Sequence, residues 1–188
     1  MSGNKGKLAV LFADIFGTSD LHERLGDERA QQSIVQCVDL MTKVLSNYEG
    51  TLVKIIGDEV MCTFPTAELA FHAACAMQSA VESGMYQDGT PMHIRIGFHY
   101  GEASHESGDV FGDTVDVAAR VAAKTRASQI IVTQAVIEAL PPALRNKTRQ
   151  LLRVELKGKL AQFDIYLVIW TSDEKLRVRI GTPDQRKS

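Results

Sequence analysis

Two aspartates that follow apolar runs are the residues of this chain best suited to chemistry. Asp14 ends the run that begins at Leu8, and Asp58 follows the run Thr51–Ile56. Apolar runs of this length are typical of buried strands. Two such strands side by side would hold both carboxylates together, and Mg²⁺ is commonly bound by one or two carboxylates plus substrate phosphates. The pattern therefore indicates two-metal phosphoryl or nucleotidyl chemistry, in which the metals hold the attacking and leaving oxygens.

The segment after Asp14 suits a metal and triphosphate site. It offers a backbone carbonyl as a hard oxygen ligand, and then a helix start at Thr18 or Ser19, where anions are favoured. The simpler alternatives are that Asp14 only caps the helix and that Asp58, which follows a glycine, only shapes a turn. The amides expected to contact phosphate oxygens are those of Ile15, Phe16, Gly17 and Thr18.

Lys54 is unusual because it interrupts the second apolar run. A charged side chain in such a setting needs a partner or a ligand. The alternative is an edge-strand lysine whose head group reaches water. Glu59, next to Asp58, is expected to face away from the metal site because adjacent strand residues point to opposite sides.

The segment Gly108–Arg120 places three acids and one arginine around a helix start. Asp116 and Arg120 are four residues apart, so they share a helical face and would form a weak surface ion pair. The functional alternative is an arginine presented to phosphate. The turn Lys157-Gly-Lys159 is basic but weak evidence alone. The three histidines with no metal-ligand spacing, expected to be structural or on the surface, are His93, His99 and His105.

The composition is that of an ordinary globular domain. The chain has 188 residues, 45% of them apolar, and a formal net charge of −2. This balance gives no electrostatic case for a nucleic-acid partner, and no apolar stretch is long enough for membrane insertion. The N-terminus lacks the apolar core of a signal peptide. Three cysteines without metal-site spacing are typical of buried thiols in a reducing compartment: Cys37, Cys62 and Cys75. We expect a cytoplasmic domain, complete or cut from a larger protein.

The spacing of apolar residues and turn signals predicts a mixed order of elements. Strands are expected at residues 8–15, 51–56, 60–64, 92–100, 129–133, 150–156 and 163–169. Helices are expected from Thr18 or Ser19 through Leu45, and at residues 67–83, 113–124 and 134–140. The order β-α-β-β-α-β predicts an α+β, ferredoxin-like core, an antiparallel sheet with helices on one face and extra C-terminal strands. In this topology the first strand lies beside the hairpin, which places Asp14 next to Asp58.

Five motifs in order identify a family. They are Phe12-Ala-Asp-Ile, Val53-Lys-Ile-Ile-Gly-Asp-Glu, Ile94-Arg-Ile-Gly-Phe-His, the segment Gly108–Arg120 and Leu156-Lys-Gly-Lys159. Together they resemble the catalytic domain of class III nucleotidyl cyclases, and most closely the bacterial adenylate cyclases. The resemblance runs from Lys7 to Trp170, so we expect a catalytic domain at residues 1–170 and a tail or linker at residues 171–188.

The resemblance implies a head-to-tail homodimer with active sites shared between its subunits. One subunit would bind two Mg²⁺ or Mn²⁺ ions through Asp14, the Ile15 carbonyl and Asp58. The reaction implied is attack of the ribose 3′-oxygen of ATP on its α-phosphate, which gives cyclic AMP and pyrophosphate. No side chain is an evident general base, so the metal would lower the pKa of the 3′-hydroxyl.

The other subunit would bind the rest of the nucleotide. The resemblance assigns Lys54 and Asp109 to adenine, Arg120 to the phosphates and Lys157 to the triphosphate tail. Lysine can donate to N1 of adenine, whereas N1 of guanine carries a hydrogen and does not accept.

One departure from the family concerns Asp116, where the family usually has Asn. Asn can donate a hydrogen bond to the ribose, but an ionised Asp can only accept. Asp116 would also pair with Arg120 and hold it off the phosphate. The departure leaves open a catalytically weak, nucleotide-binding regulatory domain, and guanylate cyclase is the alternative within the family. A diguanylate cyclase is disfavoured because the segment around Gly57-Asp58-Glu59 lacks the Gly-Gly-Asp/Glu-Glu-Phe motif of that family.

Overall fold

The computed structural model describes residues 3–151, 154–155 and 162–172. The strands are β1 (Asn4–Ile15), β2 (Thr51–Ile56), β3 (Glu59–Phe64), β4 (Ile94–Glu106), β5 (Asp109–Phe111), β6 (Ile130–Thr133), β7 (Thr148–Gln150), β8 (Val154–Glu155), β9 (Gln162–Phe163) and β10 (Ile165–Val168). The helices are α1 (Thr18–Leu25), α2 (Asp27–Val44), α3 (Ala67–Glu82), α4 (Asp113–Lys124), α5 (Gln134–Ala139) and α6 (Pro142–Arg145), with short 3-10 turns η1 (Leu45–Tyr48) and η2 (Gln87–Gly89).

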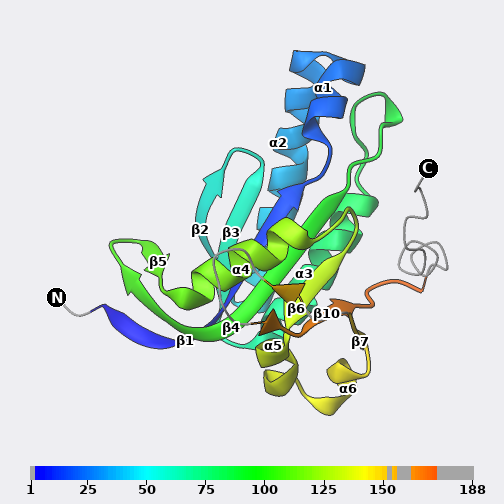
Figure 1. Ribbon diagram of the computed structural model, residues 1–188. Coiled ribbons are helices and arrows are strands. Elements are labelled where there is room, and N and C mark those ends of the chain that lie inside the picture. Colours follow the sequence, from blue (N-terminus) through cyan, green and yellow to red (C-terminus); the bar gives the residue numbers. More distant parts are fainter. Residues whose placement is uncertain (1–2, 152–153, 156–161, 173–188) are drawn as a thin grey trace.

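The large sheet has the strand order β2-β3-β1-β4-β6-β10-β7, with β5 paired to the outer part of β4 (Figure 1). All these pairs are antiparallel except β4 with β6, which is parallel. The first strand therefore lies between the hairpin strand β3 and β4, which confirms the predicted β-α-β-β-α-β core. Strands β8 and β9 form a separate two-stranded pair.

Strand β1 is buried on both of its faces and forms the centre of the fold. Alternate residues from Ala9 to Ile15 pack with α2 and α3 in the larger core cluster. Val10 and Phe12 point the other way and pack with α4. The prediction of helices on one face is confirmed for the core helices α1 to α3. Helix α4, which follows the core, covers the opposite face, and Asp14 belongs to this face because it lies two residues after Phe12.

Helix α4 lies directly on β4 because β4 carries glycine at two contact points. A Cβ added at Gly97 would come within 2.4 Å of the Ala122 amide nitrogen, and one at Gly101 within 2.6 Å of Thr114 Oγ1. Real Cβ atoms do not approach so closely, so these two glycines allow the close contact between strand and helix. The contact sets how far above the sheet the side chains of α4 stand.

The helical segment after Asp14 differs from the sequence prediction. Two helices replace the single expected helix, and Gly26 separates them with a positive φ of 79°. The predicted cap at Thr18 or Ser19 is also wrong, because Gly17 precedes the helix and no side chain caps it. The positive φ of Gly17, 78°, is a conformation that glycine adopts without strain.

Other predictions are confirmed or need small corrections. The hairpin β2-β3, helix α3 with its Thr66 cap, and α4 occur where expected. Strand β4 runs six residues beyond its predicted end at residue 100 and pairs with β5, which the sequence did not indicate. Cys37 and Cys62 are buried and Cys75 is half-buried, all as free thiols. In the described ranges, no helix is both long and apolar enough to cross a bilayer.

Candidate active site

Asp14 and Asp58 lie close together at one end of the neighbouring strands β1 and β3, as the sequence predicts. Asp14 stands one residue before the end of β1, and Asp58 lies in the turn between β2 and β3. The Ile15 amide donates to the Asp58 carbonyl oxygen at 3.4 Å, which holds the turn against β1. Burial raises the pKa of Asp14 above its usual range, and the charge and hydrogen-bonding contact of Asp58 raise it further, while Arg95 opposes both.

Arg95 is the counter-ion of Asp14 in this structure. It lies directly opposite Asp14 in the β1-β4 register. Its Nε and Nη2 atoms donate to the same oxygen, Asp14 Oδ2, at 3.0 Å and 2.8 Å. Both side chains are largely covered, with 30% of Arg95 and 15% of Asp14 exposed. The sequence analysis did not predict this ion pair, although Arg95 is part of one of the five motifs.

Glu59 lies on the same face as Asp14, so the prediction that it points away is wrong. The β1-β3 register pairs these two residues directly, and directly opposed residues share a face. Burial raises the pKa of Glu59, and the charges of Asp14 and Asp58 add to this effect. The alternation argument failed because Asp58 belongs to the turn, where the two-residue period of a strand does not hold.

The carboxylates of Asp14 and Asp58 fit a hard divalent cation. Burial is the largest cause of the raised pKa of Asp14, and the charge of Asp58 adds to it; a cation between the two carboxylates would relieve that repulsion. Across the described part of the chain, no group of three His, Cys, Asp or Glu side chains is arranged to hold a metal ion. The set would thus need backbone, water or substrate oxygens, which is the usual pattern for Mg²⁺.

The amides after Asp14 are only partly available for phosphate. The Ile15 amide is used by Asp58, and the Phe16 amide donates to the His93 carbonyl oxygen at 2.8 Å. A phosphate contact from these two amides is therefore disfavoured. The amides of Gly17 and Thr18 stand at the start of α1, where amides have no partner within the helix.

Lys54 and Asp109 form a second ion pair on the same face of the sheet. Lys54 lies opposite Met61, which packs in the cluster beneath α4, and its Nζ atom donates to Asp109 Oδ2 at 2.9 Å. The bond joins β2 to the start of β5, elements 55 positions apart in sequence. The hydrogen bond from Lys54 and one from the Val110 amide hold the pKa of Asp109 below its usual value. The partner that the apolar setting of Lys54 required is therefore Asp109.

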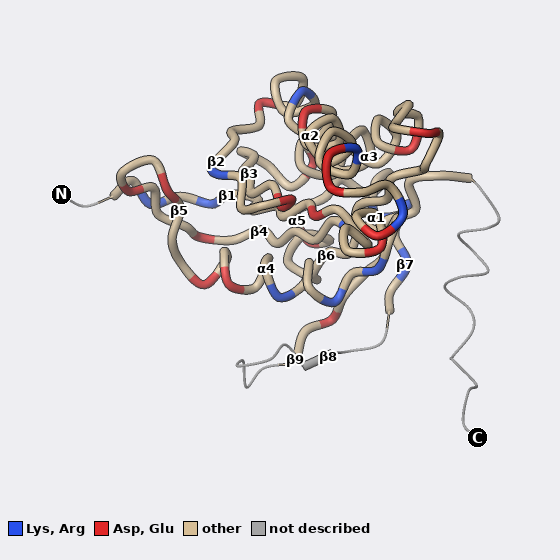
Figure 2. Tube along the Cα trace, turned by 90° about the horizontal axis from the view of Figure 1, so that it is seen from above, with Lys and Arg blue, Asp and Glu red and all other residues tan. Residues whose placement is uncertain are grey.

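Arg120 lies on α4, half-buried, and its Nη1 atom is buried without a hydrogen-bond partner. An N–H group of the guanidinium in this state can donate a hydrogen bond to an anion without first breaking another hydrogen bond. Figure 2 shows acidic residues at the start of α4 and basic residues in its later turns. Among the residues that the structure describes, no ion pair joins Asp116 to Arg120, so the predicted pairing is wrong. Asp116 is exposed. Lys157 lies outside the described residues.

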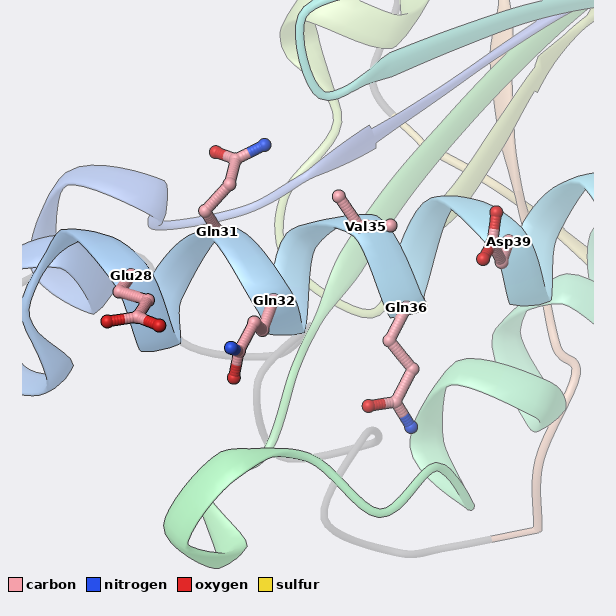
Figure 3. Close-up of a pocket in the computed structure, with 6 residues that line it drawn as sticks. All are labelled: Glu28, Gln31, Gln32, Val35, Gln36 and Asp39. Carbon is pink, nitrogen blue, oxygen red and sulfur yellow. The ribbon is translucent and has the colours of Figure 1, made fainter.

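A separate open hollow of about 500 Å³ follows the outer side of α2 (Figure 3). Among the described residues that line it, none is a predicted site residue. The residues that line it are Glu28, Gln31, Gln32, Val35, Gln36 and Asp39.

Comparison with known families gives the chain its identity. The family model of the adenylate and guanylate cyclase catalytic domain matches residues 1–170. The chain belongs to this family. Among curated relatives, the adenylate cyclase of Streptomyces coelicolor is 31% identical over 134 residues, which cover 71% of this chain and 34% of that protein. The cyclase domain described here thus spans about a third of the length of that relative.

Solved cyclase structures share the fold. The guanylate cyclase domain of RhGC from Catenaria anguillulae, in complex with GTP, superposes with a TM-score of 0.78 at 19% identity and covers 88% of this chain and 97% of its own. An adenylate/guanylate cyclase/hydrolase from Silicibacter pomeroyi gives 0.77 at 25% identity, with 89% and 98% covered. These matches confirm the predicted nucleotidyl cyclase fold.

Proposed function

We propose that this cyclase domain converts ATP to 3′,5′-cyclic AMP and pyrophosphate at sites shared between two copies of the chain. The observation that carries the choice of ATP is the contact between Lys54 and Asp109, one donor and one acceptor held 2.9 Å apart at the edge of the sheet. Adenine offers the matching groups, an acceptor at N1 and a donor at its exocyclic amine. Guanine has a donor at N1 and an acceptor at its exocyclic oxygen, so the Lys54 donor would face another donor and the Asp109 acceptor another acceptor.

Two Mg²⁺ or Mn²⁺ ions would be held by the carboxylates of Asp14 and Asp58 and by the Ile15 carbonyl. When bound, such ions supply charge that lowers the pKa of the ribose 3′-hydroxyl and neutralises the phosphates. The two carboxylates would hold the ions in place because Asp14 is fixed near the end of β1 and Asp58 in the adjoining turn. The raised pKa of Asp14, caused by burial and by Asp58, supports a site built for a cation.

Arg120 would stabilise the α-phosphate while its bond to the 3′-oxygen forms and its bond to pyrophosphate breaks. Negative charge on the phosphate oxygens needs a donor that is already in place. The buried Nη1 atom of Arg120, which has no hydrogen-bond partner, supports this role. Lys157 is proposed to bind the triphosphate tail.

A homodimer is proposed because the edge of the sheet near Lys54 exposes apolar side chains. Leu52, Ile55 and Ile56 on β2 are 42%, 46% and 53% exposed, and Phe111 on β5 is 49% exposed. Exposed apolar patches of this kind commonly mark an interaction surface. A second copy that covers this edge would bring its own carboxylates toward Lys54 and Asp109.

Two alternatives are favoured by particular observations. Guanylate cyclase activity is an alternative because the matching family model covers both adenylate and guanylate cyclases, and a weakly catalytic domain is an alternative because Asp116 stands in place of the usual Asn. The first alternative predicts turnover of GTP instead of ATP, and the second predicts nucleotide binding with little or no cyclic product.

The test is product formation from ATP or GTP with Mn²⁺ or Mg²⁺, in the wild type and in Asp14→Ala. We expect cyclic AMP from ATP in the wild type and a loss of about a thousandfold or more in the variant, because metal stabilisation supplies several kcal/mol. Asp88→Ala is the matched control, since it removes an aspartate that is ion-paired to Arg29 on the surface. Cyclic GMP alone would favour the first alternative. ATP binding without product would favour the second.

A further inference from the structure

The ion pair between Arg95 and Asp14 uses one carboxylate oxygen twice. Nε and Nη2 of Arg95 both donate to Asp14 Oδ2, at 3.0 Å and 2.8 Å. Each carboxylate oxygen has about two lone-pair positions, so two donors saturate Oδ2. These two hydrogen bonds leave Oδ1 as the Asp14 oxygen open to another ligand.

The acidic neighbours of Asp14 favour a positive charge beside its carboxylate. Asp58 and Glu59 both act on the Asp14 carboxyl from the neighbouring turn and strand. Arg95 supplies the positive charge that offsets them in this structure. A divalent ion at the same place would meet both a saturated oxygen and a like charge, which repel it unless the guanidinium moves.

We propose that Arg95 is an internal competitor of the metal, occupying Asp14 until a divalent ion displaces it and so keeping the metal affinity of the nucleotide-free domain low. This proposal rests on the metal-binding role proposed above for Asp14. Arg95 is therefore a positioning residue, which acts through the carboxylate that it occupies.

The fold allows this exchange without a change in the sheet. Asp14 and Arg95 are fixed opposite each other by the β1-β4 register, so their backbones stay in place. The arginine side chain is long and 30% exposed, so it can turn toward solvent. Displacement therefore requires only a rotation of the Arg95 side chain.

The test is a titration of the nucleotide-free domain with Mn²⁺ at about pH 7.5, where a carboxylate is normally ionised. The electron paramagnetic resonance signal of free Mn²⁺ measures how much of the ion is bound. We expect Arg95→Gln to bind Mn²⁺ about tenfold more tightly than the wild type, because the variant removes a like charge and the paired N–H donors that occupy Oδ2, and a tenfold change is about the size of one hydrogen bond. Arg95→Lys should lie between them, because it keeps the charge but cannot donate two fixed N–H groups to one oxygen.

Arg29→Gln is the matched control. It removes an arginine that donates to Asp88 at 2.7 Å on the surface, so its Mn²⁺ affinity should equal that of the wild type. Far-ultraviolet circular dichroism checks that each variant is folded.

The outcomes separate the two proposals. If Asp14→Asn loses Mn²⁺ binding while Arg95→Gln binds no more tightly than the wild type, the competitor role of Arg95 is overturned and the metal site stands. If Asp14→Asn binds Mn²⁺ as well as the wild type does, the metal role of Asp14 itself is overturned, and the role of Arg95 falls with it.

Discussion

Two aspartates, each paired with a basic side chain, stand on one face of the same sheet and behave in opposite ways. Asp14 receives Arg95 at 2.8 Å, and Asp109 receives Lys54 at 2.9 Å. The pKa of Asp14 is nevertheless raised, whereas the pKa of Asp109 is lowered. The contact distance is almost the same, so the difference arises from the surroundings.

The surroundings differ in burial and in neighbouring charge. Asp14 is 15% exposed and lies beside Asp58, so it loses hydration and gains repulsion. Asp109 is 32% exposed, and its hydrogen bonds from Lys54 and the Val110 amide outweigh its small burial effect. An ion pair thus does not by itself decide the state of a carboxylate. The first site is suited to receive a further cation, and the second to act as a constant acceptor.

Among the changes that test this comparison, the largest effect is expected from reversing the second pair. Lys54→Glu with Asp109→Cys replaces the donor and acceptor by groups that suit guanine, so the ratio of ATP to GTP turnover should fall by about a hundredfold. The ratio of kcat/KM values for the two nucleotides is the measurement. Each single substitution is the control, since it should lose ATP turnover without gaining GTP turnover. An unchanged ratio in the double variant would mean that this pair does not read the purine.

A smaller effect is expected at Asp116. Asp116→Asn restores a hydrogen-bond donor toward the ribose and removes a negative charge from the helix that carries Arg120. We expect kcat/KM for ATP to stay equal or to rise by up to about tenfold, the value of one hydrogen bond. A large loss of kcat/KM would show that the aspartate itself is required.

The smallest effect concerns stability, and its sign separates the two aspartates. The raised pKa of Asp14 means that its protonated form favours the fold at low pH and that this contribution is lost as the pH rises through the native pKa. The lowered pKa of Asp109 means the reverse, a contribution present above the ordinary pKa and lost as the pH falls through the native one. Urea unfolding of the wild type and of each Asp→Asn variant from about pH 2.5 to about pH 7.5 measures this difference, because the contribution of Asp109 changes mainly below its ordinary pKa of 3.8.

Over that range the stability of the wild type, relative to Asp14→Asn, should fall as the pH rises. Relative to Asp109→Asn it should increase. Slopes of the same sign in both comparisons would contradict the assignment of opposite environments.

Much of the fold follows from local pattern in the sequence. The hairpin β2-β3 has its own turn signal and helix α4 its own apolar spacing, and the order of elements then places Asp14 beside Asp58. The segment after Asp14 was predicted to form a single helix, where the structure has α1 and α2, because the apolar spacing continues past Gly26. The break depends on a positive φ that a glycine permits but does not require.

The part of the site that sequence reasoning missed depends on strand register. Arg95 meets Asp14 because β1 and β4, 81 positions apart at this point, pair in one register, and a shift by one residue would turn Arg95 to the other face. Glu59 was misplaced because strand alternation was applied to Asp58 and Glu59 together, whereas β3 begins at Glu59 and Asp58 lies in the turn. For Arg95, the sequence offered one signal: the motif Ile94-Arg-Ile-Gly contains a charged side chain among apolar residues.

The most direct test of the central claim is to mix two inactive variants, Asp14→Asn and Arg120→Ala, and to measure cyclic AMP formation. Asp14 would serve one active site and Arg120 of the same chain another, so a mixed dimer has one site with both changes and one with neither. Equal amounts should therefore recover about a quarter of wild-type activity, since about half of the dimers are mixed. A mixture that stays as inactive as its components, although it forms mixed dimers, would contradict a site shared between two copies.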